Sequence, residues 1–255
     1  MDHFIYLLNN LPTESMLVLE FFTLFSILVT LIYFFREAGL YVFIVISMIT
    51  ANLQVLKLVQ YSFYPEPIAL GKMAFCFTFL ASDILAECFG KKSAYRGVYI
   101  GFSANLGLML LMLVTIGYPP LLVSKGVNFH DYLKLIFTPI PGVFFASVIS
   151  YAISQFIDIS TFLRLKDHFK GKYVWIRTFS STVLASFFDN MIFYTLAFYV
   201  LNDFSIDIRT LIYSYIIGTF MFRVSIIFFS STIIYVAKLI ITMPEQIKIF
   251  GREVV

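Results

Sequence analysis

The chain has 255 residues, of which 60% are apolar and only 13% are charged. Its mean hydropathy of +0.90 excludes an ordinary soluble domain, in which about half of the residues are apolar and about a quarter are charged. The net charge of +3 is too small to indicate a nucleic-acid partner. We therefore expect an integral membrane protein.

Hydropathy predicts seven membrane-spanning helices. The third is short, which suits a span that ends at an aqueous mouth, and the last is long enough to be tilted or kinked. The expected fold is an all-α polytopic bundle of about six core transmembrane helices with one additional N-terminal helix. The predicted spans are Met16–Phe35, Leu40–Tyr61, Ala74–Phe89, Tyr95–Gly117, Leu135–Ile159, Thr178–Leu201 and Arg209–Ile241.

The basic residues alternate between the loops as the positive-inside rule requires. The N-terminus and every second loop have few of them, so we predict that the N-terminus lies outside and the C-terminus inside. We divide the chain into an N-terminal segment with the additional helix (1–39), a core (40–241) and a cytoplasmic tail (242–255). The basic loops contain Arg36, Lys91, Lys92, Arg96, Arg164, Lys166, Lys170, Lys172, Arg177, Lys238, Lys248 and Arg252.

Several predicted spans contain charged residues, and a lone charge at mid-membrane costs at least about 2.5–3.5 kcal/mol. Asp83 and Glu87 are four residues apart, so their carboxyls share one face of a helix. Glu87 has a second interpretation as a helix-surface partner of Lys91. Asp189 and Arg223 lie near the middle of their spans, where they either neutralise each other or line a polar cavity. We expect these groups to face the interior of the bundle.

Small and polar residues recur every four positions in several spans, a pattern that is typical of close helix packing. Asn105 belongs to such a stripe, Gln155 lies beside another, and Asp158 lies at the inner end of its span. No pair of His or Cys has metal-ligand spacing, and no phosphate-binding loop motif is present. We therefore expect no metal, no other cofactor and no ATP hydrolysis.

Several short motifs follow one another in a specific order from the second predicted span onward. Together they resemble the queuosine precursor transporter family, which is grouped with the vitamin uptake transporters. The resemblance implies that residues 40–241 form a transporter core and that Met16–Phe35 is an additional helix. The motifs are Thr50-Ala51-Asn52-x-Gln54, Phe79-Leu80-Ala81-Ser82-Asp83-Ile84-Leu85-x-Glu87-x-Phe89-Gly90-Lys91-Lys92-x-Ala94, Gln155-x-x-Asp158 with Phe162, and Arg177-x-x-x-Ser181-Thr182 with Asp189.

The resemblance implies uptake of a 7-deazaguanine, such as queuine or 7-cyano-7-deazaguanine, through the bacterial inner membrane. The edge of a guanine-like base offers two adjacent hydrogen-bond donors to a carboxylate. The carbonyl of the base needs a donor from the protein, and its flat ring packs well against aromatic side chains. We expect Asp189 or Glu87 to accept from the purine edge. The predicted substrate-binding residues are Asn52, Gln54, Asp83, Glu87, Asn105, Gln155, Asp158, Asp189, Arg223, Phe75 and Phe79.

Two other classes of function stay open beside the importer. The chain could be a substrate-capturing membrane subunit of a multi-component uptake system, or an intramembrane enzyme in which Asp83 and Asp189 meet as an acid pair. We predict an importer rather than an enzyme. Its expected partners are the base and the lipid bilayer, a homodimer is allowed, and no nucleic acid is expected.

Overall fold

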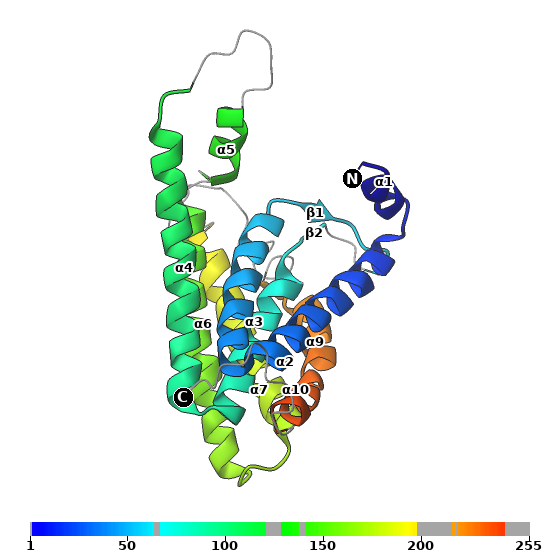
Figure 1. Ribbon diagram of the computed structural model, residues 1–255, viewed down its shortest axis with the longest axis vertical. Helices are drawn as coiled ribbons and strands as arrows, with labels where there is room; N and C mark the ends of the chain where they lie inside the picture. Colours follow the sequence, from blue (N-terminus) through cyan, green and yellow to red (C-terminus); the bar gives the residue numbers. More distant parts are fainter. Residues whose placement is uncertain are drawn as a thin grey trace, which may run out of the picture.

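The computed structural model describes residues 2–63, 67–120, 129–137, 141–197, 216–217 and 219–242. Figure 1 shows long helices gathered into a bundle, with a small antiparallel sheet of β1 (Leu58–Val59) and β2 (Ile68–Ala69) at one end. The predicted all-helical membrane class is confirmed at this level. The helices are α1 (Asp2–Asn9), α2 (Thr13–Gln54), α3 (Lys72–Cys88), α4 (Lys91–Gly117), α5 (Phe129–Phe137), α6 (Pro141–His168), α7 (Val174–Thr195), α9 (Thr219–Ser230) and α10 (Ile233–Thr242).

Within the described residues, four segments are long and apolar enough to cross a membrane. Two of them coincide with single helices, α2 and α4, and one is the part of α6 from Ala146 onward. The fourth combines α9 and α10. The segments are Thr13–Gln54, Lys91–Gly117, Ala146–His168 and Thr219–Thr242.

α2 contains the first predicted span and most of the second, with a sharp break between them. The backbone leaves helical geometry at Arg36 (φ 49°, ψ −119°), a conformation that costs a non-glycine residue of order 1–3 kcal/mol. Arg36 also donates a 3.1 Å hydrogen bond to the carbonyl oxygen of Ile241 in α10. Gly39 allows the two arms to meet, because a Cβ there would lie 2.0 Å from the carbonyl oxygen of Leu31.

Two predicted span boundaries are wrong. The second span does not reach Tyr61, because α2 ends at Gln54 and the following residues form β1. The fifth span, Leu135–Ile159, crosses from α5 into α6, and α6 continues to His168. The seventh, Arg209–Ile241, ends within one residue of the end of α10, and a turn between α9 and α10 gives it the kink that its length allows. Its first part lies outside the described residues. The third and fourth spans match α3 and α4.

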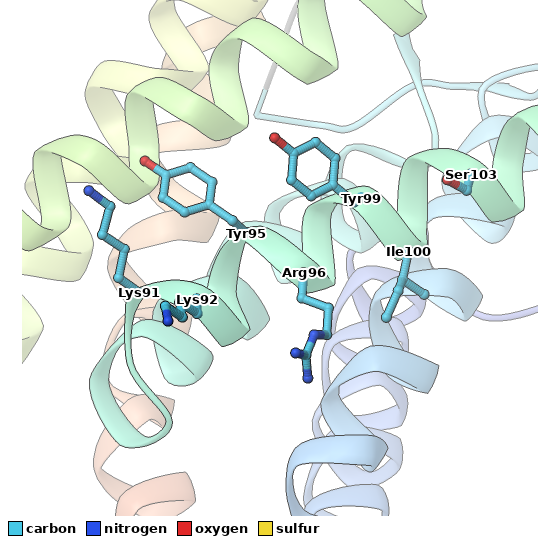
Figure 2. Close-up of a pocket in the computed structure, with 7 residues that line it drawn as sticks. All are labelled: Lys91, Lys92, Tyr95, Arg96, Tyr99, Ile100 and Ser103. Carbon is cyan, nitrogen blue, oxygen red and sulfur yellow. The ribbon is translucent and has the colours of Figure 1, made fainter.

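α4 has one side in the bundle and one side exposed. Gly97, Gly101 and Asn105 are buried on the inner side, which packs against α2 and α6. Lys92 and Tyr99 project from the exposed side, which Figure 2 shows from close by.

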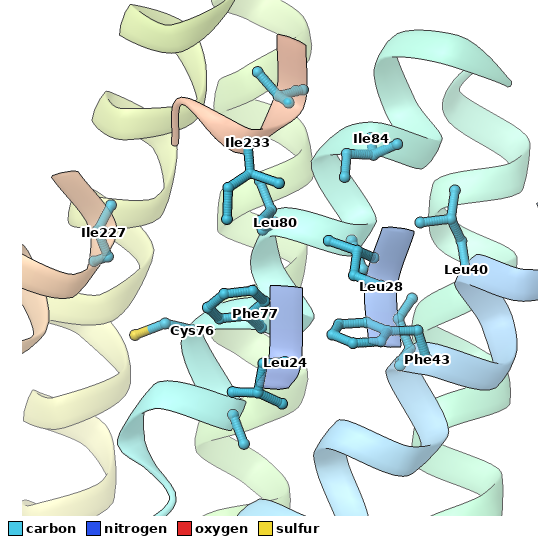
Figure 3. Packing of buried hydrophobic residues seen from close by; sticks show 14 of the residues in the cluster. Leu24, Leu28, Leu40, Phe43, Cys76, Phe77, Leu80, Ile84, Ile227 and Ile233 are labelled. Carbon is cyan, nitrogen blue, oxygen red and sulfur yellow. The ribbon is translucent and has the colours of Figure 1, made fainter. Parts of the chain in front are cut away.

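α3 is the centre of the bundle. Nearly every residue from Met73 to Ala86 is buried, and the helix packs against α2, α4, α6, α7, α9 and α10. Figure 3 shows Phe77 of α3 beside Leu28 and Phe43, which come from the two arms of α2. Lipid is as apolar as these side chains, so the contacts stabilise the bundle mainly through close packing.

One end of the bundle is basic. The start of α4, the end of α6, the start of α7 and α10 lie together at this end, whereas α1, the sheet and α5 lie at the opposite end (Figure 1). Lys166, Arg177 and Lys238 all reach the same carboxylate here. The predicted sorting of basic residues is therefore present in space, and the assignment of this basic end to the cytoplasm stays a prediction.

We predict that Gly101→Leu destabilises the bundle. A Cβ on Gly101 would lie 2.7 Å from Cγ2 of Ile44, and overpacking of this kind costs about 1–3 kcal/mol. Gly107→Leu is the matched control, since a Cβ there meets nothing within 4 Å. Melting in one detergent should give a lower Tm for the first variant only, and equal Tm values would contradict the close approach of α2 and α4.

Candidate functional site

Buried polar side chains form a column between α3, α6, α7 and α9. On α7 the polar residues Arg177, Ser181 and Asp189 share a four-residue spacing in which Ala185 occupies the remaining position, over a distance of about 18 Å at 1.5 Å per residue. We call this set the polar column and name its three charged levels after Glu87, Asp83 and Asp189. The Glu87 level lies at the basic end, and the Asp189 level lies farthest from that end along α7.

At the Glu87 level, one carboxylate receives three cations. Arg177 donates to both oxygens of Glu87 at 3.2 Å. Lys166 Nζ lies 3.0 Å from Oε2 and Lys238 Nζ lies 3.0 Å from Oε1. These contacts join α3, α6, α7 and α10.

The cations at this level differ in how far they are buried. The Arg177 side chain is fully buried over the ring of Phe162, whereas Lys238 is 44% exposed. Removing one partner of a buried ion pair costs about 3–5 kcal/mol. The predicted alternative, a pair between Glu87 and Lys91, is wrong, because the Lys91 ammonium lies instead over the ring of Tyr95.

The Asp83 level contains a second acid. Asp83 on α3 and Asp158 on α6 are both fully buried, and their charges repel each other. Ser181 donates a 3.5 Å hydrogen bond to Oδ2 of Asp83 and also lies beside Asp158. Within the part of the chain that the structure describes, Oδ1 of Asp83 and both oxygens of Asp158 have no hydrogen-bond partner. Placing two carboxylates in one buried site is electrostatically costly.

The Asp189 level is an ion pair between α7 and α9. Arg223 Nη1 lies 2.6 Å from Oδ2 of Asp189, and both side chains are more than nine-tenths buried. Oδ1 of Asp189 receives only a long, 3.4 Å hydrogen bond from Ser154. Of the two sequence-based interpretations, mutual neutralisation is therefore present, and one carboxylate oxygen retains capacity to accept.

Aromatic side chains border this ion pair. The Arg223 guanidinium lies 4.9 Å from the centre of the Phe75 ring. Phe75 in turn contacts Phe79 and Tyr151 edge to face, with ring centres 5.4 and 5.6 Å apart. Two polar atoms of these side chains, Arg223 Nε and Tyr151 Oη, are buried without a hydrogen-bond partner among the described residues.

Gln155 belongs to the polar column and is fully engaged in it. Its oxygen accepts from Ser82 at 3.1 Å, and its nitrogen donates to Thr78 at 3.2 Å. Both partners are on α3, so this amide fastens α6 to the central helix. The predicted role of Gln155 in substrate binding stays a prediction.

The other predicted amides lie outside the column. Asn52 donates to Oδ1 of Asn105 at 3.0 Å and joins α2 to α4. Gln54 donates to Glu20 at 3.0 Å and joins the two arms of α2. Their described hydrogen bonds do not connect them to Asp83 or Asp189.

Sequence reasoning missed several residues of the column. Arg177 and Ser154 could have been found from the sequence, since each belongs to a stripe of small or polar residues that recur every four positions. Tyr151 could have been found too, since it precedes Gln155 by four residues. No local sequence pattern indicates that Lys166 and Lys238 belong to the column. They reach Glu87 from helices far away along the chain.

The described residues contain no group of three or more His, Cys, Asp or Glu that could hold a metal ion. Asp83 contacts Ser181, whereas Asp189 contacts Arg223 and Ser154. The hydrogen bonds and ion pairs described do not join the two acids, as an intramembrane acid pair would require.

A family model described as "Putative vitamin uptake transporter" matches residues 69–237, more than half of the chain. The match includes Glu87, Asp83 and Asp189. The chain belongs to this family. It is therefore a membrane transporter, and the family resemblance predicted from the sequence is confirmed.

Two relatives bear the same name. A Bacillus subtilis (strain 168) protein named "Probable queuosine precursor transporter" is 28% identical over 229 residues, which cover 89% of this chain and 96% of that protein. A Haemophilus influenzae (strain ATCC 51907 / DSM 11121 / KW20 / Rd) protein of that name is 24% identical over 133 residues, or 52% of this chain and 53% of that protein. No solved structure matches the chain.

We predict opposite effects on stability for two conservative changes in the column. Asp189→Asn leaves the buried Arg223 without a counter-charge, which costs about 3–5 kcal/mol. Asp158→Asn removes one of two repelling acids and should leave Tm unchanged or raise it. Melting curves of both variants in the same detergent and pH test this, and an equal drop in Tm would contradict the repulsion at the Asp83 level.

Proposed function

We propose that this transporter imports a queuosine precursor through the bacterial inner membrane and binds the base at the Asp189 level. The substrate would be a 7-deazaguanine such as queuine, 7-cyano-7-deazaguanine or its aminomethyl analogue. The names of the two relatives support this class of substrate. The observation that carries the proposal is the unfilled hydrogen-bonding capacity around the Asp189–Arg223 pair.

Buried polar groups in proteins almost always have partners, so a group of orphans in one place suggests a ligand. Oδ1 of Asp189, which receives a long hydrogen bond from Ser154, can accept from the donor edge of a guanine-like base. The free Nε of Arg223 can donate to the carbonyl of the base. The Phe75 ring beside the guanidinium supplies an apolar face for a flat heterocycle.

The other predicted acceptor, Glu87, is less suited to hold the base. Both of its oxygens already receive cations, and three helices supply them. A ligand edge would have to displace a charge-assisted hydrogen bond, which is about twice as strong as a neutral one. We assign Glu87 to closing the column at the basic end.

Import would require the Glu87 level to open in one state of the transport cycle. Lys166 and Lys238 are 31% and 44% exposed, so water can compensate their charges when they leave Glu87. Arg177 is fully buried and would stay paired. The chain has no phosphate-binding loop, so the gradient of the substrate, a coupled ion or a partner subunit would drive the cycle.

We predict that Asp189→Asn weakens binding of the base to the purified protein. Loss of a hydrogen bond to a charged group costs about 1.5–3 kcal/mol, which corresponds to about 10- to 150-fold in Kd. The matched control is Asp167→Asn, the same change at an exposed position of α6. Titration with labelled queuine and 7-cyano-7-deazaguanine measures the effect. An Asp189→Asn variant with the affinity of the wild type would remove this carboxylate from the site.

We predict that Glu87→Gln alters transport and leaves the affinity for the base within a factor of about three. The variant loses the charge that holds the three cations, so closure at the basic end weakens while the Asp189 level stays intact. Uptake into liposomes that contain only this purified chain measures the effect. Binding without uptake by the wild-type protein alone would favour a substrate-capturing subunit over an importer.

A further inference from the structure

The exposed side of α4 carries a groove that the polar column does not use. It has a volume of about 920 Å³ and lies near the basic end, at the first turns of the helix. Figure 2 shows Lys91, Lys92 and Arg96 around it, together with the rings of Tyr95 and Tyr99. The two rings pack against Phe156 of α6, with centres 5.5 and 6.0 Å away, which holds the wall of the groove in place.

The groove is strongly positive. Its three cations occur within six positions of one helix, and none of them takes part in the ion pairs described for the chain. Glu37 of α2 is the acid whose charge acts on Arg96, and it is itself bonded to Tyr41. Gly90 provides no side-chain cap for α4, so the amide groups of the first turn add partial positive charge. The groove is thus suited to an anion.

The same side of α4 becomes apolar farther along the helix. The spacing of three and four residues that links Lys92, Arg96 and Tyr99 continues through Ser103 to Leu106 and Leu110. Leu110 is 55% exposed, and Val114 one turn on is 63% exposed. Leu106 lies about 15 Å beyond Arg96 at 1.5 Å per residue, which is the depth of one bilayer leaflet. A molecule with a charged head and an apolar tail therefore fits this side of the helix in one orientation.

We propose that this groove binds an anionic phospholipid from the leaflet at the basic end. Lys92 and Arg96 contact the phosphate, the tyrosine rings lie at the interface where aromatic side chains are enriched, and the acyl chains follow Leu106 and Leu110. This occupant is favoured over a second copy of the chain. A twofold contact through this side would place the three cations of one copy against the same three of the other.

The binding site is tested with detergent-purified protein and added lipid, with phosphatidylglycerol as the anionic probe and phosphatidylcholine as the neutral one. Phosphatidylglycerol should raise the Tm of the wild-type protein and should remain bound in native mass spectrometry. The double variant K92Q/R96Q should bind it about 30-fold more weakly, since each basic residue near an anionic surface contributes roughly fivefold. The conservative variant K92R/R96K should bind it like the wild type.

The matched control is K170Q/K172Q, which removes two exposed lysines from the loop at the same end of the bundle. It should retain the response to phosphatidylglycerol. Equal loss of response in both double variants would overturn the site, because it would reduce the effect to overall charge. Stabilisation of the wild type by inorganic phosphate at the same concentration, or by phosphatidylcholine, would also overturn it.

Discussion

A charged side chain at bilayer depth has to find its partner on another helix, because lipid offers it none. Glu87 meets this requirement through three cations from α6, α7 and α10, and Asp189 meets it through Arg223 of α9. These pairs surround α3, the short and almost fully buried helix at the centre. The order of the helices around α3 therefore follows from where the charges must be neutralised.

The three levels of the polar column differ in what they leave unsatisfied. The Glu87 level is saturated, since both of its carboxylate oxygens have charged donors. The Asp83 and Asp189 levels keep buried acceptors and donors that have no hydrogen-bond partner among the described residues. A saturated level is suited to closing a path, and an unsaturated level is suited to holding a polar ligand. This division supports the proposal that the substrate binds at the Asp189 level, away from the basic end.

Some features of the fold could be predicted because a local pattern determines them. The break in α2 is predicted by the polar residues at Arg36 and Glu37 between two apolar runs. The end of that helix could not be predicted, because the residues that form β1 are as apolar as those that form the helix. The residues predicted to line the pocket likewise agree with the structure only in part. Asp83 and Glu87 do face inward, whereas Asn52 bonds to Asn105 and Gln54 bonds to Glu20, away from the acids.

Hydropathy and charge, read along the sequence by itself, determined that this is a helical membrane protein whose intramembrane acids lie inside the bundle. That result needs only the cost of exposing a charge to lipid. Which cation meets which acid was decided by the tertiary structure alone. Glu87 and Lys238 are 151 positions apart, and Lys91, the partner that helical spacing suggests, turns to Tyr95 instead. Local spacing contains no information about contacts that form only when separate helices pack together.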